Sequence, residues 1–158
     1  MIFQNVLYVI GYLLSALSII LCIPAGVDAF YGDNQWQAFT FSSLISLFFG
    51  IILILANKSD NFDMSIKQVF LFTTLSWVFI AFFGSLPFVF SDLQLSFTDA
   101  FFESMSGITT TGSTILAGLD HLPHGILIWR SLLQWIGGIG IVVIAIAFLP
   151  ILKVGGMQ

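Results

Sequence analysis

The chain has 158 residues, of which 58% are hydrophobic and only 8% are charged. Soluble domains carry about 25% charged residues, so this composition predicts an integral membrane protein that is embedded in the lipid bilayer as its partner. The single cysteine, Cys22, excludes an internal disulfide and a cysteine-cluster metal site, and a formal net charge of −4 argues against a nucleic-acid partner.

Two apolar segments without charges come first. Val6 to Val27 is long enough, at about 1.5 Å per residue, to cross a hydrocarbon core of about 30 Å. No basic residue precedes it, which favours a retained helix over a signal peptide. Pro24 is expected to kink or stop this helix near its end. The second segment runs from Trp36 to Ala56. Between the two segments a polar turn is expected, with Asp28, Tyr31, Gly32, Asp33 and Asn34.

Two further long apolar segments complete the set of predicted membrane spans. The third runs from about Gln68 to Phe90, after a polar turn at 57–63, and carries Pro87 close to its end. The last runs from about Gly125 to Leu152. A loop at 119–124 precedes it.

The lysines predict the orientation of these segments. Lys58 and Lys67 flank the turn between the second and third segments, and Lys153 follows the last. Because positive residues concentrate on the cytoplasmic side, these ends and both termini are expected there. The third segment then leads outward and the last leads back, so the stretch between them must enter and leave by the outer face. On that face lie the acidic residues Asp28, Asp33, Asp92 and Asp120.

The stretch from Ser96 to Thr114 has the properties of a re-entrant loop. Its first part, Thr98 to Gly107, predicts about 15 Å of helix, half of the hydrocarbon thickness. Ser96 or Thr98 can cap this helix, and Asp99 lies in its first turn, where the helix dipole favours a carboxylate. Its other end directs unpaired carbonyls toward the middle of the membrane.

The second part of this stretch, Thr109 to Thr114, is a poor membrane helix. Its β-branched residues, hydroxyls and glycine all disfavour helical structure, so it is expected to return as extended chain. Such backbone is tolerated at membrane depth only where it is buried in protein or lines a wet cavity. A half-helix followed by bare carbonyls predicts a cation site.

Arg130 is expected about a turn and a half into the last segment. An arginine at membrane depth either extends to water or pairs with an anion. Asp99 and Glu103 lie four residues apart and share one face of the predicted half-helix. Glu103 is the deeper of the two, so the prediction is an Arg130–Glu103 ion pair that holds the half-helix in place.

Two motifs carry a resemblance to a known family. Residues 101–113, Phe-Phe-Glu-Ser-Met-Ser-Gly-Ile-Thr-Thr-Thr-Gly-Ser, strongly resemble the first pore loop of the Trk/Ktr/HKT potassium-transport superfamily. Residues 129–140, Trp-Arg-Ser-Leu-Leu-Gln-Trp-Ile-Gly-Gly-Ile-Gly, resemble the helix that follows that loop. In this family four helix–pore-loop–helix repeats of one polypeptide surround one pore. The resemblance therefore implies an all-α polytopic membrane protein with an extra helix pair at 1–57 and the first repeat at 58–158.

The resemblance also implies a function, namely uptake of K⁺ across the bacterial inner membrane through a carbonyl-lined selectivity filter. No enzymatic activity and no cofactor are implied. A cytoplasmic nucleotide-binding regulatory subunit is an expected partner, as are the three remaining repeats, since this chain supplies one quarter of a filter. It is expected to be part of a longer protein; assembly with further subunits is the alternative. The implied K⁺-binding carbonyls are those of Thr110, Thr111, Gly112 and Ser113, supported by Thr109, Glu103 and Arg130.

Three other interpretations were weighed against this one. A membrane scaffold without transport has no use for the hydroxyl-rich stretch at 109–114. An enzyme would have to use Asp120 with His121 or His124, and no orienting partner can be named for such a pair. The two histidines could also hold a metal, but Pro123 between them favours a loop. The glycines Gly137, Gly138 and Gly140 favour close helix packing, with a hinge as the alternative.

Overall fold

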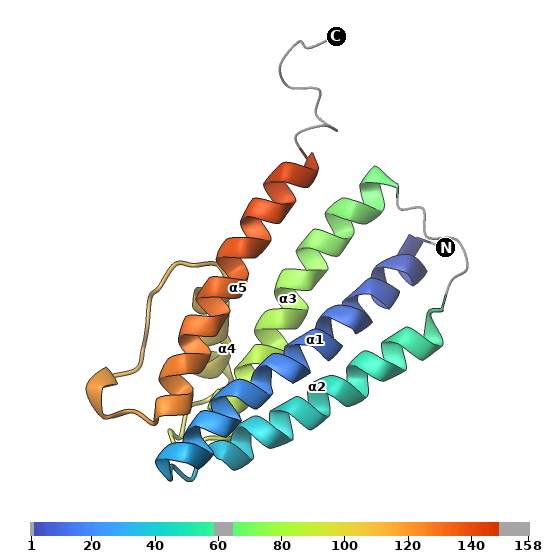
Figure 1. The fold of residues 1–158 in the computed structure, drawn as a ribbon. Coiled ribbons are helices and arrows are strands. Elements are labelled where there is room, and N and C mark those ends of the chain that lie inside the picture. The colour runs from blue at the N-terminus through green and yellow to red at the C-terminus, as the bar shows by residue number, and fades with distance from the viewer. Residues whose placement is uncertain (1, 59–64, 149–158) are drawn as a thin grey trace.

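The computed structural model describes residues 2–58 and 65–148, which form five α-helices and one short 3₁₀-helix (Figure 1). In chain order these are α1 (Ile2–Tyr31), α2 (Trp36–Ala56), α3 (Ile66–Phe90), α4 (Phe97–Ile108), η1 (Leu119–His121) and α5 (His124–Phe148). The predicted ends Leu152 and Lys153 lie outside the described residues. The half-helix was predicted at 98–107 and is one residue longer at each end.

Four of these helices, α1, α2, α3 and α5, are long and apolar enough to cross a membrane. The remaining helix, α4, has 12 residues and is about 18 Å long, too short to span a core of about 30 Å. The prediction of four spanning helices and one half-membrane helix is therefore confirmed for the described part of the chain.

The helix ends are distributed as the lysine pattern predicted. Figure 1 shows the start of α1, the end of α2, the start of α3 and the end of α5 at one end of the bundle. At this end the side chain of Gln4 donates a hydrogen bond to the Lys58 carbonyl, at 3.4 Å. The α1–α2 turn, the connection from α3 to α4, and the start of α5 lie at the opposite end (Figure 1). The segment from α4 to η1 thus enters and leaves by the same end.

Helices α1 and α2 pack with their backbones in contact. A Cβ atom added to Gly11 would lie 2.8 Å from the Gly50 carbonyl oxygen, so neither position has room for a side chain. Further along, the Ser43 hydroxyl donates to the Ser18 carbonyl across the interface, at 2.7 Å. Small residues and interhelical hydrogen bonds are the usual means of joining helices in lipid. Helix α1 also supplies Leu14 and Leu21 to the shared core.

Pro24 was expected to kink or stop α1, and the structure shows that it does not stop the helix. Pro24 lies inside α1, and the helix continues to Tyr31, so Asp28 and Tyr31 are helical rather than part of the turn. Proline removes one hydrogen bond, a loss that membrane helices tolerate when neighbours stabilise the following turn. Here the last turn of α1 is held by contacts to α5: the Gly125 N–H donates to Asp28, and Tyr31 stacks on His124.

Candidate functional site

Helix α4 begins at a side-chain cap. The Ser96 hydroxyl oxygen accepts a hydrogen bond from the Asp99 N–H at 3.1 Å and donates to the Asp99 carboxylate at 2.7 Å. Of the two predicted caps, Ser96 is the one present. The Asp99 carboxylate in the first turn lies where the helix dipole is positive, which stabilises the start of the half-helix.

Glycines allow α4 to lie deep between α3 and α5. On α3, a Cβ added to Gly84 would lie 2.6 Å from the Ser104 hydroxyl of α4. On α5, a Cβ added to Gly137 would overlap the Ile108 carbonyl at the end of α4. The close-packing interpretation is confirmed for Gly137. For Gly138 and Gly140 nothing in the described chain lies within 4 Å of a Cβ placed there, so close packing at these two positions stays a prediction.

The chain leaves α4 through a tight turn rather than as extended backbone. The N–H of Thr110 donates to the Gly107 carbonyl at 2.9 Å, and the N–H of Thr111 donates to the Ser106 carbonyl at 3.1 Å. These bonds satisfy carbonyls that the helix end leaves without partners. The prediction of extended chain from Thr109 onward is therefore wrong for Thr109 and Thr110. Beyond this turn, residues 111–117, called the return segment, form no regular secondary structure.

Two residues of this turn and the return segment have positive φ. Gly112 has φ +75°, which glycine adopts freely, but Thr110 has φ +59°, which is unusual for a β-branched residue. Such a conformation costs about 1–3 kcal/mol and persists only where the surroundings impose it. Here a hydrogen bond of 2.9 Å joins the hydroxyls of Thr109 and Thr111 on either side. The backbone at Thr110 is a feature that sequence reasoning missed.

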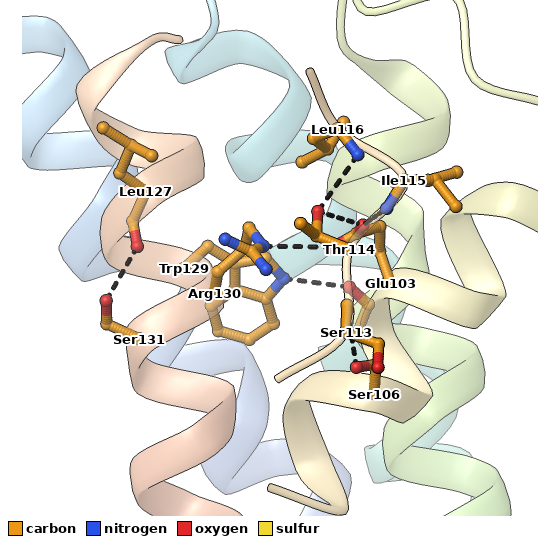
Figure 2. Close-up of polar contacts among 11 residues, drawn as sticks. Glu103, Ser106, Ser113, Thr114, Ile115, Leu116, Leu127, Trp129, Arg130 and Ser131 are labelled. Atoms are coloured by element: carbon orange, nitrogen blue, oxygen red, sulfur yellow. Dashed lines mark hydrogen bonds and ion pairs between the residues drawn. The ribbon is translucent and has the colours of Figure 1, made fainter. Parts of the chain in front are cut away.

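The predicted filter carbonyls differ in their partners. The Ser113 carbonyl accepts a hydrogen bond from the Ser106 hydroxyl of α4 at 2.6 Å (Figure 2). Among the described residues, no hydrogen bond reaches the carbonyls of Thr110, Thr111 or Gly112. These three groups are therefore available to a ligand, while Ser113 keeps one lone pair. Ser106 was not identified from the sequence, because a serine inside a helix normally bonds to its own backbone.

Glu103 is the centre of the site. Its side chain is fully buried and accepts a hydrogen bond from the Arg130 Nε at 3.0 Å, so the predicted ion pair is confirmed (Figure 2). Arg130 is only 15% exposed and does not extend to water. The other Glu103 oxygen accepts from the Thr114 hydroxyl at 2.5 Å and from the Ile115 N–H at 2.6 Å. One carboxylate thus joins α4, α5 and the return segment.

The histidines form no metal site in the described part of the chain. No group of three or more His, Cys, Asp or Glu side chains there is placed to hold a metal ion. His124 instead pairs with Asp33 at 2.9 Å, and its hydrogen bonds lower the pKa of the Asp33 carboxyl below its usual value. Among the described residues, no hydrogen bond joins Asp120 to His121 or His124, as an enzymatic pair would need.

Comparisons with known proteins agree with this arrangement. A family model described as the cation transport protein TrkH matches residues 35–158. The Trk system potassium uptake protein TrkH of Escherichia coli strain K12 is 45% identical over 157 residues, which cover 99% of this chain and 32% of that protein. The Trk system potassium uptake protein TrkI of Halomonas elongata is 44% identical over 153 residues, covering 97% of this chain and 31% of that protein.

A solved structure shows the same fold. The crystal structure of the potassium transporter TrkH from Vibrio parahaemolyticus matches with a TM-score of 0.92 and 40% identity, covering 100% of this chain and 34% of that chain. The chain spans about a third of the length of the curated relatives it matches. With a family model covering residues 35–158 and the same helix arrangement throughout, this multi-pass membrane protein belongs to the TrkH family of cation transport proteins.

Proposed function

We propose that this chain supplies the first filter segment of a protein that takes up K⁺ across the membrane. The observation that carries the proposal is the end of α4 inside the bundle, followed by three carbonyls without donors, at Thr110, Thr111 and Gly112. A helix C-terminus carries about half a negative charge, which favours a cation beside it. Carbonyl oxygens can then replace the hydration shell of a permeating ion. The choice of K⁺ rests on relatives named as potassium uptake proteins.

The Ser113 carbonyl would take a secondary place in this filter. Its hydrogen bond from the Ser106 hydroxyl fixes its direction and uses one lone pair. The Glu103–Arg130 pair would keep the return segment at a constant distance from α4 and α5, with Thr109 closing the turn. This division of roles supports residues 110–112 as the main ligands and Thr109, Glu103, Ser106 and Arg130 as their support.

The proposal includes the partners that a complete pore needs. Three further repeats would supply the rest of the filter, and a cytoplasmic nucleotide-binding subunit would regulate it. Residues 1–57 would be an accessory helix pair and residues 58–158 the first repeat. The location would be a bacterial inner membrane. Because ions pass without covalent change, no catalytic group or cofactor is needed.

The test is a pair of glycine substitutions in an intact four-repeat protein that contains these 158 residues. Gly112 and Gly118 both have positive φ, +75° and +67°, so a side chain strains the backbone at either position. Only Gly112 lies in the filter. Gly112→Ser is therefore expected to lower the K⁺-over-Na⁺ flux ratio by about tenfold, equal to 1.4 kcal/mol of lost discrimination, while Gly118→Ser leaves the ratio near wild type.

The flux assay also separates this function from a scaffold without transport. Equal ratios for Gly112→Ser and the wild-type protein would count against a carbonyl filter. If several substitutions across residues 109–114 left K⁺ uptake intact, the scaffold would be the better interpretation.

A further inference from the structure

Residues 28–35, the last turn of α1 together with the connection to α2 and called the α1–α2 turn from here on, contact the start of α5. The Asp28 carboxylate accepts a hydrogen bond from the Gly125 N–H, and the Asp33 carboxylate accepts one from the His124 N–H at 3.1 Å. His124 and Gly125 are the first residues of α5, whose N–H groups have no acceptor within the helix. Two carboxylates from another part of the chain therefore cap α5 at its positive end.

The same turn also holds the segment that follows α3. The Gln35 amide donates to the Asp92 carboxylate at 2.8 Å, and its oxygen accepts from the Asp92 N–H at 3.1 Å. Asp92 lies two residues after the end of α3. The α1–α2 turn thus binds the segment just after α3 and the first residues of α5, and α4 with its return segment lies between these two helices.

The burial of Asp28 indicates that its contact with Gly125 does more than pack α1 against α5. Asp28 is 0% exposed, and a side chain at Gly125 would overlap its carboxylate. One of its oxygens has no hydrogen-bond partner among the described residues. A buried carboxylate is costly, and an ionisable residue in a membrane helix marks a functional position by default. A neutral residue would fill this space at lower cost.

A short series of contacts leads from this cap to the filter. Gly125 and Arg130 lie on the same helix, about 7.5 Å apart along its axis. Arg130 binds the buried Glu103, and Glu103 accepts hydrogen bonds from Thr114 and Ile115 of the return segment. A shift or rotation of α5 at its capped end would move Arg130 and, with it, the groups that set the direction of the carbonyls.

We propose that the α1–α2 turn is a positioning clamp for the filter, with Asp28 and Gln35 as its positioning residues. This inference rests on the proposed function. It gives the extra helix pair a role in ion selection. The pair fixes the segment after α3 and the start of α5. As a result, the distance between α4 and the return segment suits one ion.

The test uses two substitutions in an intact four-repeat protein. Asp28→Ala removes the cap, and Gln35→Ala removes the link to Asp92 without a change in charge. Each is expected to lower the K⁺-over-Na⁺ flux ratio by about fivefold, equal to about 1 kcal/mol. Asp28→Asn keeps an oxygen that accepts the Gly125 N–H and is expected to restore most of the ratio. Asp120→Ala, an exposed acidic residue at the same end of the bundle, should leave the ratio unchanged.

A double substitution tests the route of the effect. If the clamp acts through Glu103, Asp28→Ala should change the ratio far less in a Glu103→Gln background than in the wild-type protein. Lower flux with an unchanged ratio in both Asp28→Ala and Gln35→Ala would overturn the clamp and leave only a structural role. A wild-type protein without K⁺ selectivity would overturn the proposed function and, with it, any role of the clamp in selection.

Discussion

Glu103 shows how a single residue connects three segments of this protein. It was singled out from the sequence because a carboxylate deep in a half-helix needs a cation, and Arg130 was the candidate within reach. The ion pair is present at 3.0 Å. What the spacing could not indicate is the second half of the site, in which the same carboxylate accepts hydrogen bonds from Thr114 and Ile115. Those bonds depend on where the return segment lies.

Removal of the Arg130 guanidinium should strongly destabilise the protein. Arg130→Leu leaves the fully buried Glu103 carboxylate without its cation, which costs about 3–5 kcal/mol for a buried pair. The midpoint of thermal unfolding in detergent should therefore fall. Adding Glu103→Gln to Arg130→Leu should recover part of the loss, because the amide is neutral and can still accept from Ile115. Ser131→Ala, at an exposed position on the same helix, is the control. If the stability losses of the two single substitutions simply added up in the double variant, the pairing of Arg130 with Glu103 would be contradicted.

At the scale of elements, the position of α4 depends on close backbone contact with its neighbours. Gly84 and Gly137 remove the side chains that would keep α4 away from α3 and α5. The Trp129 indole on α5 donates to the Gly84 carbonyl at 2.9 Å, which joins these two helices beside α4. Because α5 meets the backbone of Ile108 directly at Gly137, a single added methyl group there is enough to displace the end of the half-helix.

A substitution at Gly137 is expected to move the filter. In Gly137→Ala the new Cβ would overlap the Ile108 carbonyl, which belongs to backbone and cannot rotate away. In an intact four-repeat protein this change should reduce K⁺ flux by about tenfold or more and lower the unfolding midpoint by an amount equal to about 1–3 kcal/mol.

Gly138→Ala is the matched control for this prediction. It adds the same methyl group to the next residue of α5, where nothing in the described chain lies within 4 Å. It should leave flux and stability near wild type. Equal effects of the two substitutions would mean that helix propensity or contacts with other repeats matter more than the approach of α4.

At the scale of the whole molecule, the proposed filter segment would be an incomplete site, because it would line only one side of a pore. Residues Thr109 to Ile115 are exposed in this chain, although exposed polar backbone is not tolerated at membrane depth without protein or water beside it. The exposed side of α5, with Trp135, Ile139 and Val142, is apolar and offers a surface for further protein. The curated relatives are about three times as long as the chain.

The 158-residue chain by itself should therefore conduct no selective current. One set of carbonyls is too few to replace the hydration shell of K⁺. Reconstituted into liposomes as a monomer, it is expected to show K⁺ flux at the background of empty vesicles, whereas an intact four-repeat protein carries K⁺. Robust K⁺-selective flux from the monomeric chain would contradict this prediction and the quarter-filter model behind it.

The sequence alone determined the class, the number of spans in the described residues and which helix ends share one end of the bundle, because these follow from the length, apolarity and lysine placement of each segment. It also identified the half-helix, a cap at Ser96 or Thr98 and the Arg130–Glu103 pair, since these follow from short-range spacing and from the cost of an unpaired charge. The tertiary structure alone decided that α1 continues past Pro24, that Thr110 adopts a left-handed conformation and that Asp28 and Gln35 form hydrogen bonds with Gly125 and Asp92. The course of α1 and the contacts of Asp28 and Gln35 depend on groups distant in sequence, and these contacts outweigh the local tendency of proline to end a helix.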